Sequence, residues 1–188
     1  MGGLPMGVKP PASDLPRREP PENGRLPRNL FAVIVFIAMA KSIYDYPMLP
    51  DRLASHFAAS GIPNGWMMKP PFFALYALLV VVSAAVGFLV PRAIATSSDS
   101  RTHLPHKEYW LAPERRVETF AFFRRHFAWY GCALLLTEVL AIELAIQANF
   151  HSPPRLPAGP LLFLIAAFAV FNLFWTVRIF RRFSKVGG

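Results

Sequence analysis

The sequence predicts an all-α integral membrane protein: a bundle of four transmembrane helices with an outer helical loop and a cytoplasmic amphipathic helix. Hydrophobic residues make up 54% of the 188 residues and charged residues 16%, which is a membrane-protein balance. Four apolar segments approach the length of about 20 residues that a bilayer requires. Lysines and arginines cluster beside these segments, so topology explains the formal net charge of +9, and no nucleic-acid partner is expected.

The chain opens with residues 1–28, a basic, proline-rich arm that we assign to the cytoplasm. This arm has no apolar run, so it cannot bury enough surface to offset chain entropy, and we expect it to be disordered. The first transmembrane helix follows at about 29–46 and is ended by Pro47. It reaches spanning length only if the charged Lys41 is included.

A second interpretation of the first apolar segment stays open. A basic start, a short apolar core and Ala38-Met39-Ala40 also resemble a signal peptide with its cleavage site. Against cleavage stand a long basic region and two aromatic residues, Tyr44 and Tyr46. Aromatic rings gather at membrane interfaces, so these two favour a retained helix.

The outer loop, 47–70, contains most of the distinctive residues. Pro50 near its start and Gly61 past its end predict one short helix over 51–60, with His56 in the middle. A turn over 62–65 follows, in which glycine can adopt positive φ.

The second transmembrane helix, 72–90, contains no charged residue and is ended by Pro91. It completes a first transmembrane hairpin over 29–91. The basic segment 92–127 is then assigned to the cytoplasm.

Inside this cytoplasmic segment, Pro113 can begin a helix with Glu114 in its first turn, where an anion suits the helix dipole. Aromatic residues recur there at spacings of three and four: Phe120, Phe123, Phe127 and Tyr130. This pattern predicts an interfacial amphipathic helix. An extension of the third transmembrane helix into the cytoplasm is the alternative.

Residues 128–188 form a second transmembrane hairpin with a basic tail. Its spans lie at about 128–150 and 160–180. Basic residues are sparse in the 47–70 loop and in the loop between these spans, and dense elsewhere. The positive-inside rule therefore places both termini in the cytoplasm and the 47–70 loop outside.

Four polar residues lie inside the predicted spans: Lys41, Glu138, Glu143 and Asn172. At 1.5 Å per residue, Lys41 and the two glutamates reach similar depths, and Asn172 comes close to the level of Glu138. Ionisable groups in a bilayer are costly, so an ion pair between Lys41 and a glutamate is expected. This set could form a proton- or cation-linked site, or it could be a structural ion pair between helices. In a further alternative, Lys41 extends to the interface.

In the outer loop, the candidate ligand-binding residues are His56, Gly65, Trp66 and Lys69. His56 could sense protons or contact a ligand, because histidine titrates near neutral pH. In the alternative interpretation the loop is a structural cap, and Trp66 and Lys69 anchor it at the membrane surface. No paired histidine spacing supports a metal site. Since no catalytic or nucleotide-binding motif is present, we expect no enzyme activity and no cofactor.

The outer loop contains a spaced set of residues: Leu49-Pro50, His56, Gly61, Pro63, Gly65-Trp66 and Lys69. Together with a second segment, this set resembles a known family, the bacterial membrane domain of unknown function 1648. The second lies in the segment 104–119, with His106 where asparagine is usual. It includes the residues of a candidate cytoplasmic motif: Tyr109, Trp110, Pro113, Glu114, Arg115 and Arg116.

The resemblance implies a multi-pass, non-enzymatic protein of the bacterial inner (plasma) membrane. Similar proteins include the immunity and signal-transducing membrane protein of a sporulation-delay toxin system. We therefore expect a sensor or immunity-type protein whose outer loop binds an extracytoplasmic ligand or toxin and whose basic loop contacts a cytoplasmic protein. The alternative is a small proton- or ion-linked transport subunit that uses the Lys41 and glutamate set.

Overall fold

The computed structural model describes residues 25–98 and 104–185. Within these ranges, four helical segments are long and apolar enough to cross a membrane, so the predicted all-α membrane fold class is confirmed. The elements in chain order are α1 (Arg25–Asp45), the 3-10 turn η3 (Tyr46–Met48), β1 (Arg52–Phe57), β2 (Pro63–Met68), α2 (Lys69–Ala84), the π-helical segment η4 (Ala85–Leu89), α3 (Val90–Thr96), α4 (Lys107–Trp110), α5 (Pro113–Asn149) and α6 (Ala158–Phe183).

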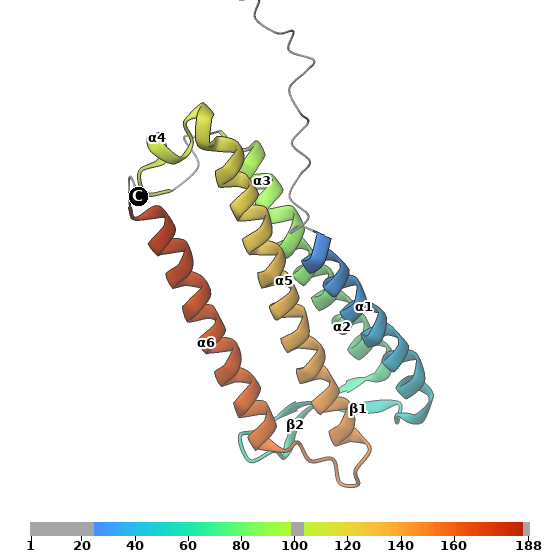
Figure 1. The fold of residues 1–188 in the computed structure, drawn as a ribbon. Coiled ribbons are helices and arrows are strands. Elements are labelled where there is room, and N and C mark those ends of the chain that lie inside the picture. Colours follow the sequence, from blue (N-terminus) through green and yellow to red (C-terminus); the bar gives the residue numbers. More distant parts are fainter. Residues whose placement is uncertain (1–24, 99–103, 186–188) are drawn as a thin grey trace, which may run out of the picture.

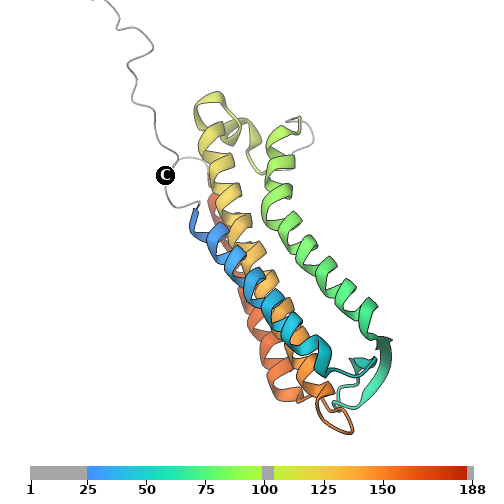
Figure 2. The same cartoon turned by 90° about the vertical axis from the view of Figure 1, so that its right-hand side faces the viewer.

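Helix α5 is the central element of the bundle (Figure 1). It packs against α1, α2, η4, α3 and α6, and its last turns also contact β1. Strands β1 and β2 lie with the α5–α6 connection at one end, which we call the hairpin end (Figure 2). The start of α1, the helix α4 and the end of α6 lie toward the opposite end, which we call the basic end.

Apolar side chains pack along α5 at both ends and at its middle. The cluster at the hairpin end contains Leu49, Leu53, Phe72 and Ile146. The middle cluster contains Phe31, Cys132 and Leu135. The cluster at the basic end contains Leu111, Phe120, Phe122, Phe123 and Phe183. Each cluster joins α5 to other elements, which ties the helices together along their length.

The outer loop corrects the prediction of a short helix over 51–60. This stretch forms β1, which pairs antiparallel with β2, and His56 therefore lies on a strand opposite Gly65. The positive φ belongs to Gly61 at +78°, in the connection between the strands, and not to the 62–65 turn. Pro50 and Gly61 resemble the start and stop signals of a helix, but contacts with α5, which is distant in the sequence, stabilise an extended backbone instead. Local propensity does not include such contacts.

The second membrane helix was predicted to end at Pro91, but it continues to Thr96. A proline ring clashes with the carbonyl group four residues earlier, here that of Gly87. The π-helical segment η4 covers this position, and widening of the backbone there is a recognised way to absorb such a clash.

Helices α5 and η4 come closest at two glycines. A Cβ atom on Gly131 would lie 2.8 Å from the Cα atom of Gly87 and 3.1 Å from the carbonyl oxygen of Ser83. Side chains larger than hydrogen do not fit between these backbones. Small residues allow such close packing of membrane helices.

The predicted amphipathic helix is not a separate element. Residues 113–149 form one continuous helix, which corresponds to the alternative of a third span extended at its amino-terminal side. Helix α1 likewise begins at Arg25, so residues 25–28 are helical and not disordered as expected. The rest of the predicted arm, 1–24, lies outside the described residues.

Candidate functional site

The hairpin of β1 and β2 is attached to the bundle through Asn149, the last residue of α5. The Ala54 N–H donates to Asn149 Oδ1 over 2.8 Å, and Asn149 Nδ2 donates to the Ala54 carbonyl oxygen over 2.9 Å. Asn149 Nδ2 also bonds the Ala145 carbonyl oxygen over 2.8 Å, which fixes the amide orientation. Both Ala54 and Asn149 are buried. The amide thus pairs with the strand backbone as a neighbouring strand would, and it covers a position on the edge of β1.

Lys69 closes the base of the hairpin. Its ammonium group donates to the Leu49 carbonyl oxygen over 2.9 Å and lies 3.6 Å from an Asp51 carboxylate oxygen. The same ammonium lies 4.8 Å from the centre of the Tyr46 ring, within cation–π range. Lys69 therefore holds together the start and the end of the outer loop.

Two glycines are required by close contacts in the hairpin. A Cβ atom on Gly65 would lie 2.8 Å from the Cβ atom of His56 on the opposite strand. A Cβ atom on Gly61 would lie 2.2 Å from the Leu156 carbonyl oxygen, and its positive φ also disfavours other residues. The Leu156 N–H donates to the Gly61 carbonyl oxygen over 3.0 Å, so the hairpin is also attached to the α5–α6 connection.

The four predicted ligand-binding residues therefore separate into two pairs. Gly65 and Lys69 are partly buried and have structural contacts. His56 is exposed, and the Trp66 side chain is 46% exposed on the paired strand. Within the described ranges, no hydrogen bond or ion pair engages the His56 ring. The structure thus presents an imidazole and an indole on a fixed two-stranded support.

A charged cluster lies between α1 and α5, near the hairpin end. Lys41 Nζ is 2.6 Å from Asp45 Oδ2 and 3.1 Å from Glu143 Oε1, so the expected ion pair with a glutamate is present. Gln147 donates a further hydrogen bond of 2.6 Å to Glu143 Oε1. Asp45 is buried while Lys41 is 41% exposed, so the cluster opens toward one side. Asp45 was not among the predicted residues.

Glu138 and Asn172 do not join this cluster. Glu138 Oε2 accepts a 2.6 Å hydrogen bond from the Ser83 hydroxyl group, which links α5 to α2. Asn172 Oδ1 accepts a 2.9 Å hydrogen bond from the Tyr130 hydroxyl group, which links α6 to α5. Tyr130 precedes Glu138 by eight residues, or about 12 Å along the helix. The predicted four-residue polar site is thus three separate interhelical contacts.

The hairpin and the helices on either side of it coincide with a recognised domain. Residues 33–90 match the family described as domain of unknown function DUF1648. This segment is a DUF1648 domain. The comparison with curated proteins and the comparison with solved structures gave no match.

The geometry gives physical reasons for the DUF1648 signature residues in the hairpin. Leu49 supplies both a buried side chain and the carbonyl acceptor for Lys69. Gly61 and Gly65 stand where a Cβ atom would collide with a neighbouring group. These signature positions maintain the hairpin and its attachment. Of the signature residues, Pro50, His56 and Trp66 stay exposed, and of these three His56 and Trp66 offer a ring N–H group for recognition.

The candidate cytoplasmic motif lies at the basic end, beyond the DUF1648 domain, as a cap over the start of α5. Thr119 Oγ1 donates to the Trp110 carbonyl oxygen over 2.9 Å, and the Trp110 ring packs edge-on against Phe183 at 5.2 Å. The Arg115 guanidinium lies 3.9 Å from the centre of the Tyr109 ring.

The other members of the motif also serve this cap. Pro113 occupies the first turn of α5 with Glu114 beside it, as predicted. The Arg116 guanidinium lies 5.1 Å from the centre of the Phe120 ring. His106 adopts a left-handed conformation with φ 51°. Asparagine is enriched at positive φ, so it would also suit this position.

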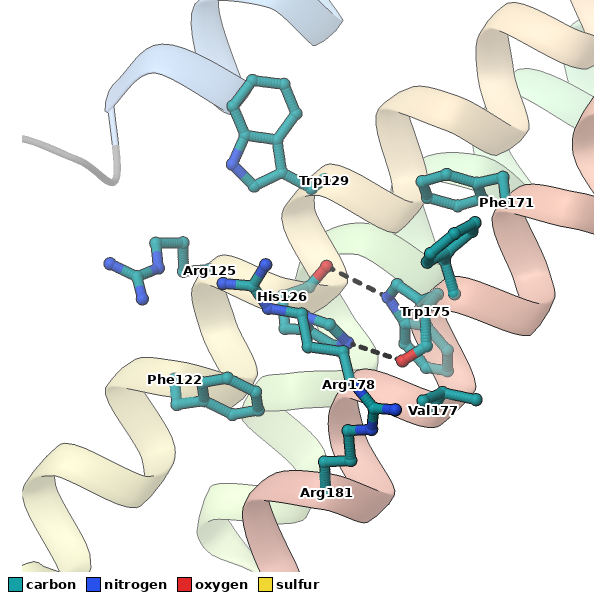
Figure 3. A pocket seen from close by; sticks show the side chains of 10 residues that line it. Phe122, Arg125, His126, Trp129, Phe171, Trp175, Val177, Arg178 and Arg181 are labelled. Atoms are coloured by element: carbon teal, nitrogen blue, oxygen red, sulfur yellow. Dashed lines mark hydrogen bonds between the residues drawn. The ribbon is translucent and has the colours of Figure 1, made fainter.

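An aromatic stack at the basic end was missed by sequence reasoning. The His126 ring lies between Phe122 and Trp175, with ring centres 5.0 and 4.8 Å away (Figure 3). Trp175 Nε1 donates to the His126 carbonyl oxygen over 3.5 Å, and His126 Nε2 lies 3.3 Å from the Trp175 carbonyl oxygen. A cavity of about 490 Å³ adjoins the stack, with Arg178 and Arg181 in its wall. These contacts hold α6 against α5.

The most informative residue that the sequence analysis missed is Asn149. A buried amide at the end of a helix is a weak sequence signal, because asparagine is also common there as a simple helix terminator. Its partner is 95 residues away in the chain. In the part of the chain that the structure describes, no group of three or more His, Cys, Asp or Glu side chains could hold a metal ion.

Proposed function

We propose that the protein is a non-enzymatic membrane receptor or immunity-type protein, in which the DUF1648 hairpin binds an extracytoplasmic ligand or toxin. The observation that carries the proposal is the division of labour in the hairpin. Asn149, Gly65 and Lys69 fix its backbone, while His56 and Trp66 remain exposed. Exposed residues on a rigid support are well suited to recognition, because little ordering is needed on binding.

The distribution of charge supports an outward orientation of the hairpin. Arginines from α1, α3, α5 and α6 gather at the basic end. By the positive-inside rule, that end and both termini would face the cytoplasm, with the protein in a bacterial inner membrane. The contacts of α1 with α5 through Phe31 and Cys132 favour a retained first helix over a cleaved one.

At the cytoplasmic side of this arrangement, the cap around Trp110 would meet a protein partner. Its surface includes the Tyr109 ring and the Arg115 guanidinium, which lie in cation–π contact. The continuous helix α5 connects this cap with Asn149 at the hairpin. A ligand on the hairpin and a partner at the cap would therefore contact the same rigid element.

Orientation is tested first, by cysteine labelling in spheroplasts. Ser60→Cys places a thiol in the exposed connection between the strands, in a Cys132→Ala background. We expect a membrane-impermeant maleimide to label it in intact spheroplasts. Labelling only after lysis would overturn the outward assignment.

Binding is tested by incorporation of a photoreactive benzoylphenylalanine in intact cells. Placed at Trp66, it should give a discrete covalent adduct, and the His56→Ala substitution should remove that adduct. Phe150 is the matched control, because it is an aromatic residue at the same end that is also exposed, at 41%. Equal adducts from both positions, or an adduct insensitive to His56→Ala, would contradict the proposal.

A second candidate function is a small proton- or ion-linked transport subunit. The contact that favours it is the hydrogen bond between Ser83 and Glu138, a carboxyl group inside the bundle. In proteoliposomes loaded with a pH-sensitive dye, this function predicts a proton flux that Glu138→Gln abolishes. Unchanged dye signals from the wild-type protein and from empty liposomes would exclude it.

A further inference from the structure

Arginines from four helices surround one groove at the basic end. The groove has a volume of about 690 Å³ and lies between α1, η4, α3 and α5. Six arginines line it: Arg25, Arg28, Arg92, Arg124, Arg125 and Arg182. Glu118 is the acidic residue among the lining groups. The positive charges are thus concentrated by the tertiary structure and not by one run of sequence.

The single carboxylate is already engaged. Arg182 Nη2 lies 2.7 Å from Glu118 Oε1, and the Arg182 guanidinium also lies 4.6 Å from the centre of the Phe122 ring. The other five arginines have exposed side chains, and none forms an ion pair with a carboxylate of residues 25–98 or 104–185. Like charges that line one groove repel one another, so an anion bound among them would lower the electrostatic free energy.

The floor of the groove is apolar. Gly87, Pro91, Phe122 and Ala128 line it and are buried. Gly87 belongs to the π-helical segment, and such segments often occur at functional sites. An occupant therefore needs an anionic part for the arginines and an apolar part for the floor.

If Asn149 lies at the outer interface, helix geometry puts the groove near the level of the inner lipid headgroups. Arg125 is 24 residues from Asn149, or about 36 Å along α5 at 1.5 Å per residue. This distance is close to the thickness of a bilayer between its two headgroup regions. On α1, exposed apolar side chains follow directly after Arg28, beginning with Leu30 and Val33. Acyl chains could extend along this surface.

We infer that this arginine groove binds the phosphate group of an anionic phospholipid. Guanidinium groups form paired hydrogen bonds with phosphate oxygens, which a cluster from several helices can supply from different directions. Basic pockets between transmembrane helices are a recognised setting for lipid headgroups. The bound lipid would bridge arginines of α1, α3 and α5.

The test uses the full chain in a neutral detergent and native mass spectrometry with dioleoyl-phosphatidylglycerol. The groove variant is Arg28→Gln/Arg92→Gln, and the matched control is Arg52→Gln/Arg155→Gln, which removes the same charge from exposed positions at the hairpin end. We expect the groove variant to lose about tenfold or more in apparent affinity. The control should bind like the wild type, and phosphatidylcholine should bind weakly to all three.

Further arms identify the source of the phosphate and do not depend on the variants. Inorganic phosphate and glycerol phosphate should not displace the lipid; displacement by either would show a free-phosphate site and overturn the lipid assignment. A photoreactive phosphatidylglycerol should label the wild-type chain at the start of α1, in α3 or within residues 113–128. Labelling confined to other segments, or equal loss of affinity in the control variant, would also overturn the inference.

Discussion

Replacing Asn149 should release the hairpin from the bundle. In Asn149→Ala, the Ala54 N–H and carbonyl groups lose their partners while the residue stays at 0% exposure. Each unsatisfied buried group costs about 1–3 kcal/mol, so the attached hairpin is destabilised by about 2–6 kcal/mol. Since every 1.4 kcal/mol is a factor of ten, amide exchange in the 52–57 peptide should accelerate about 30-fold or more.

Hydrogen–deuterium exchange followed by mass spectrometry measures this effect on the purified protein in detergent. Asn149→Asp separates hydrogen bonding from packing, because it keeps the shape but replaces the Nδ2 donor by a carboxylate oxygen. It should destabilise at least as much as alanine. Gln147→Ala is the control, since that amide on the same helix bonds Glu143 and not a strand. Unchanged exchange in both Asn149 variants would refute the attachment by Asn149.

Three further predictions concern thermal unfolding in detergent. Gly131→Ala should lower the midpoint by forcing a Cβ atom toward Gly87, an overpacking cost of about 1–3 kcal/mol; an unchanged midpoint would contradict the close contact. His106→Asn should be neutral or stabilising, whereas His106→Val should cost about 1–2 kcal/mol at its positive φ; equal midpoints would refute this strain. Lys41→Met should lower the midpoint, because it leaves the buried Asp45 carboxylate unpaired. The double variant Lys41→Met/Asp45→Asn should recover most of the lost midpoint. No recovery would exclude the ion pair as the cause.

Sequence reasoning was successful where the bilayer itself dictates the pattern. The spans follow from runs of apolar residues, and the ion pair between Lys41 and Glu143 follows from helix rise and the cost of charge in lipid. It was unsuccessful in the outer loop, where Pro50 and Gly61 imitate helix boundaries. There the strands depend on partners from distant parts of the chain, which periodicity does not reveal.

The site shows the same division. Signature residues such as Gly65 and Lys69 were identified by resemblance, but their roles became clear only from the His56 contact and the Leu49 carbonyl group. Asn172 was wrongly grouped with Glu138, although the two lie at similar depths. Residue number gives the depth of a side chain in the membrane, but it does not give the direction in which each helix turns that side chain.

The sequence by itself determined four spanning helices, the concentration of basic residues beside them and the presence of the DUF1648 signature. Only the tertiary structure decided that the outer segment is a hairpin held by Asn149. The arginine groove likewise exists only after folding, since its residues come from four helices. Hydrophobicity acts on every residue independently, so it can be read along the chain. Hydrogen bonds and charge clusters need two or more distant groups at one place, and only packing brings them there.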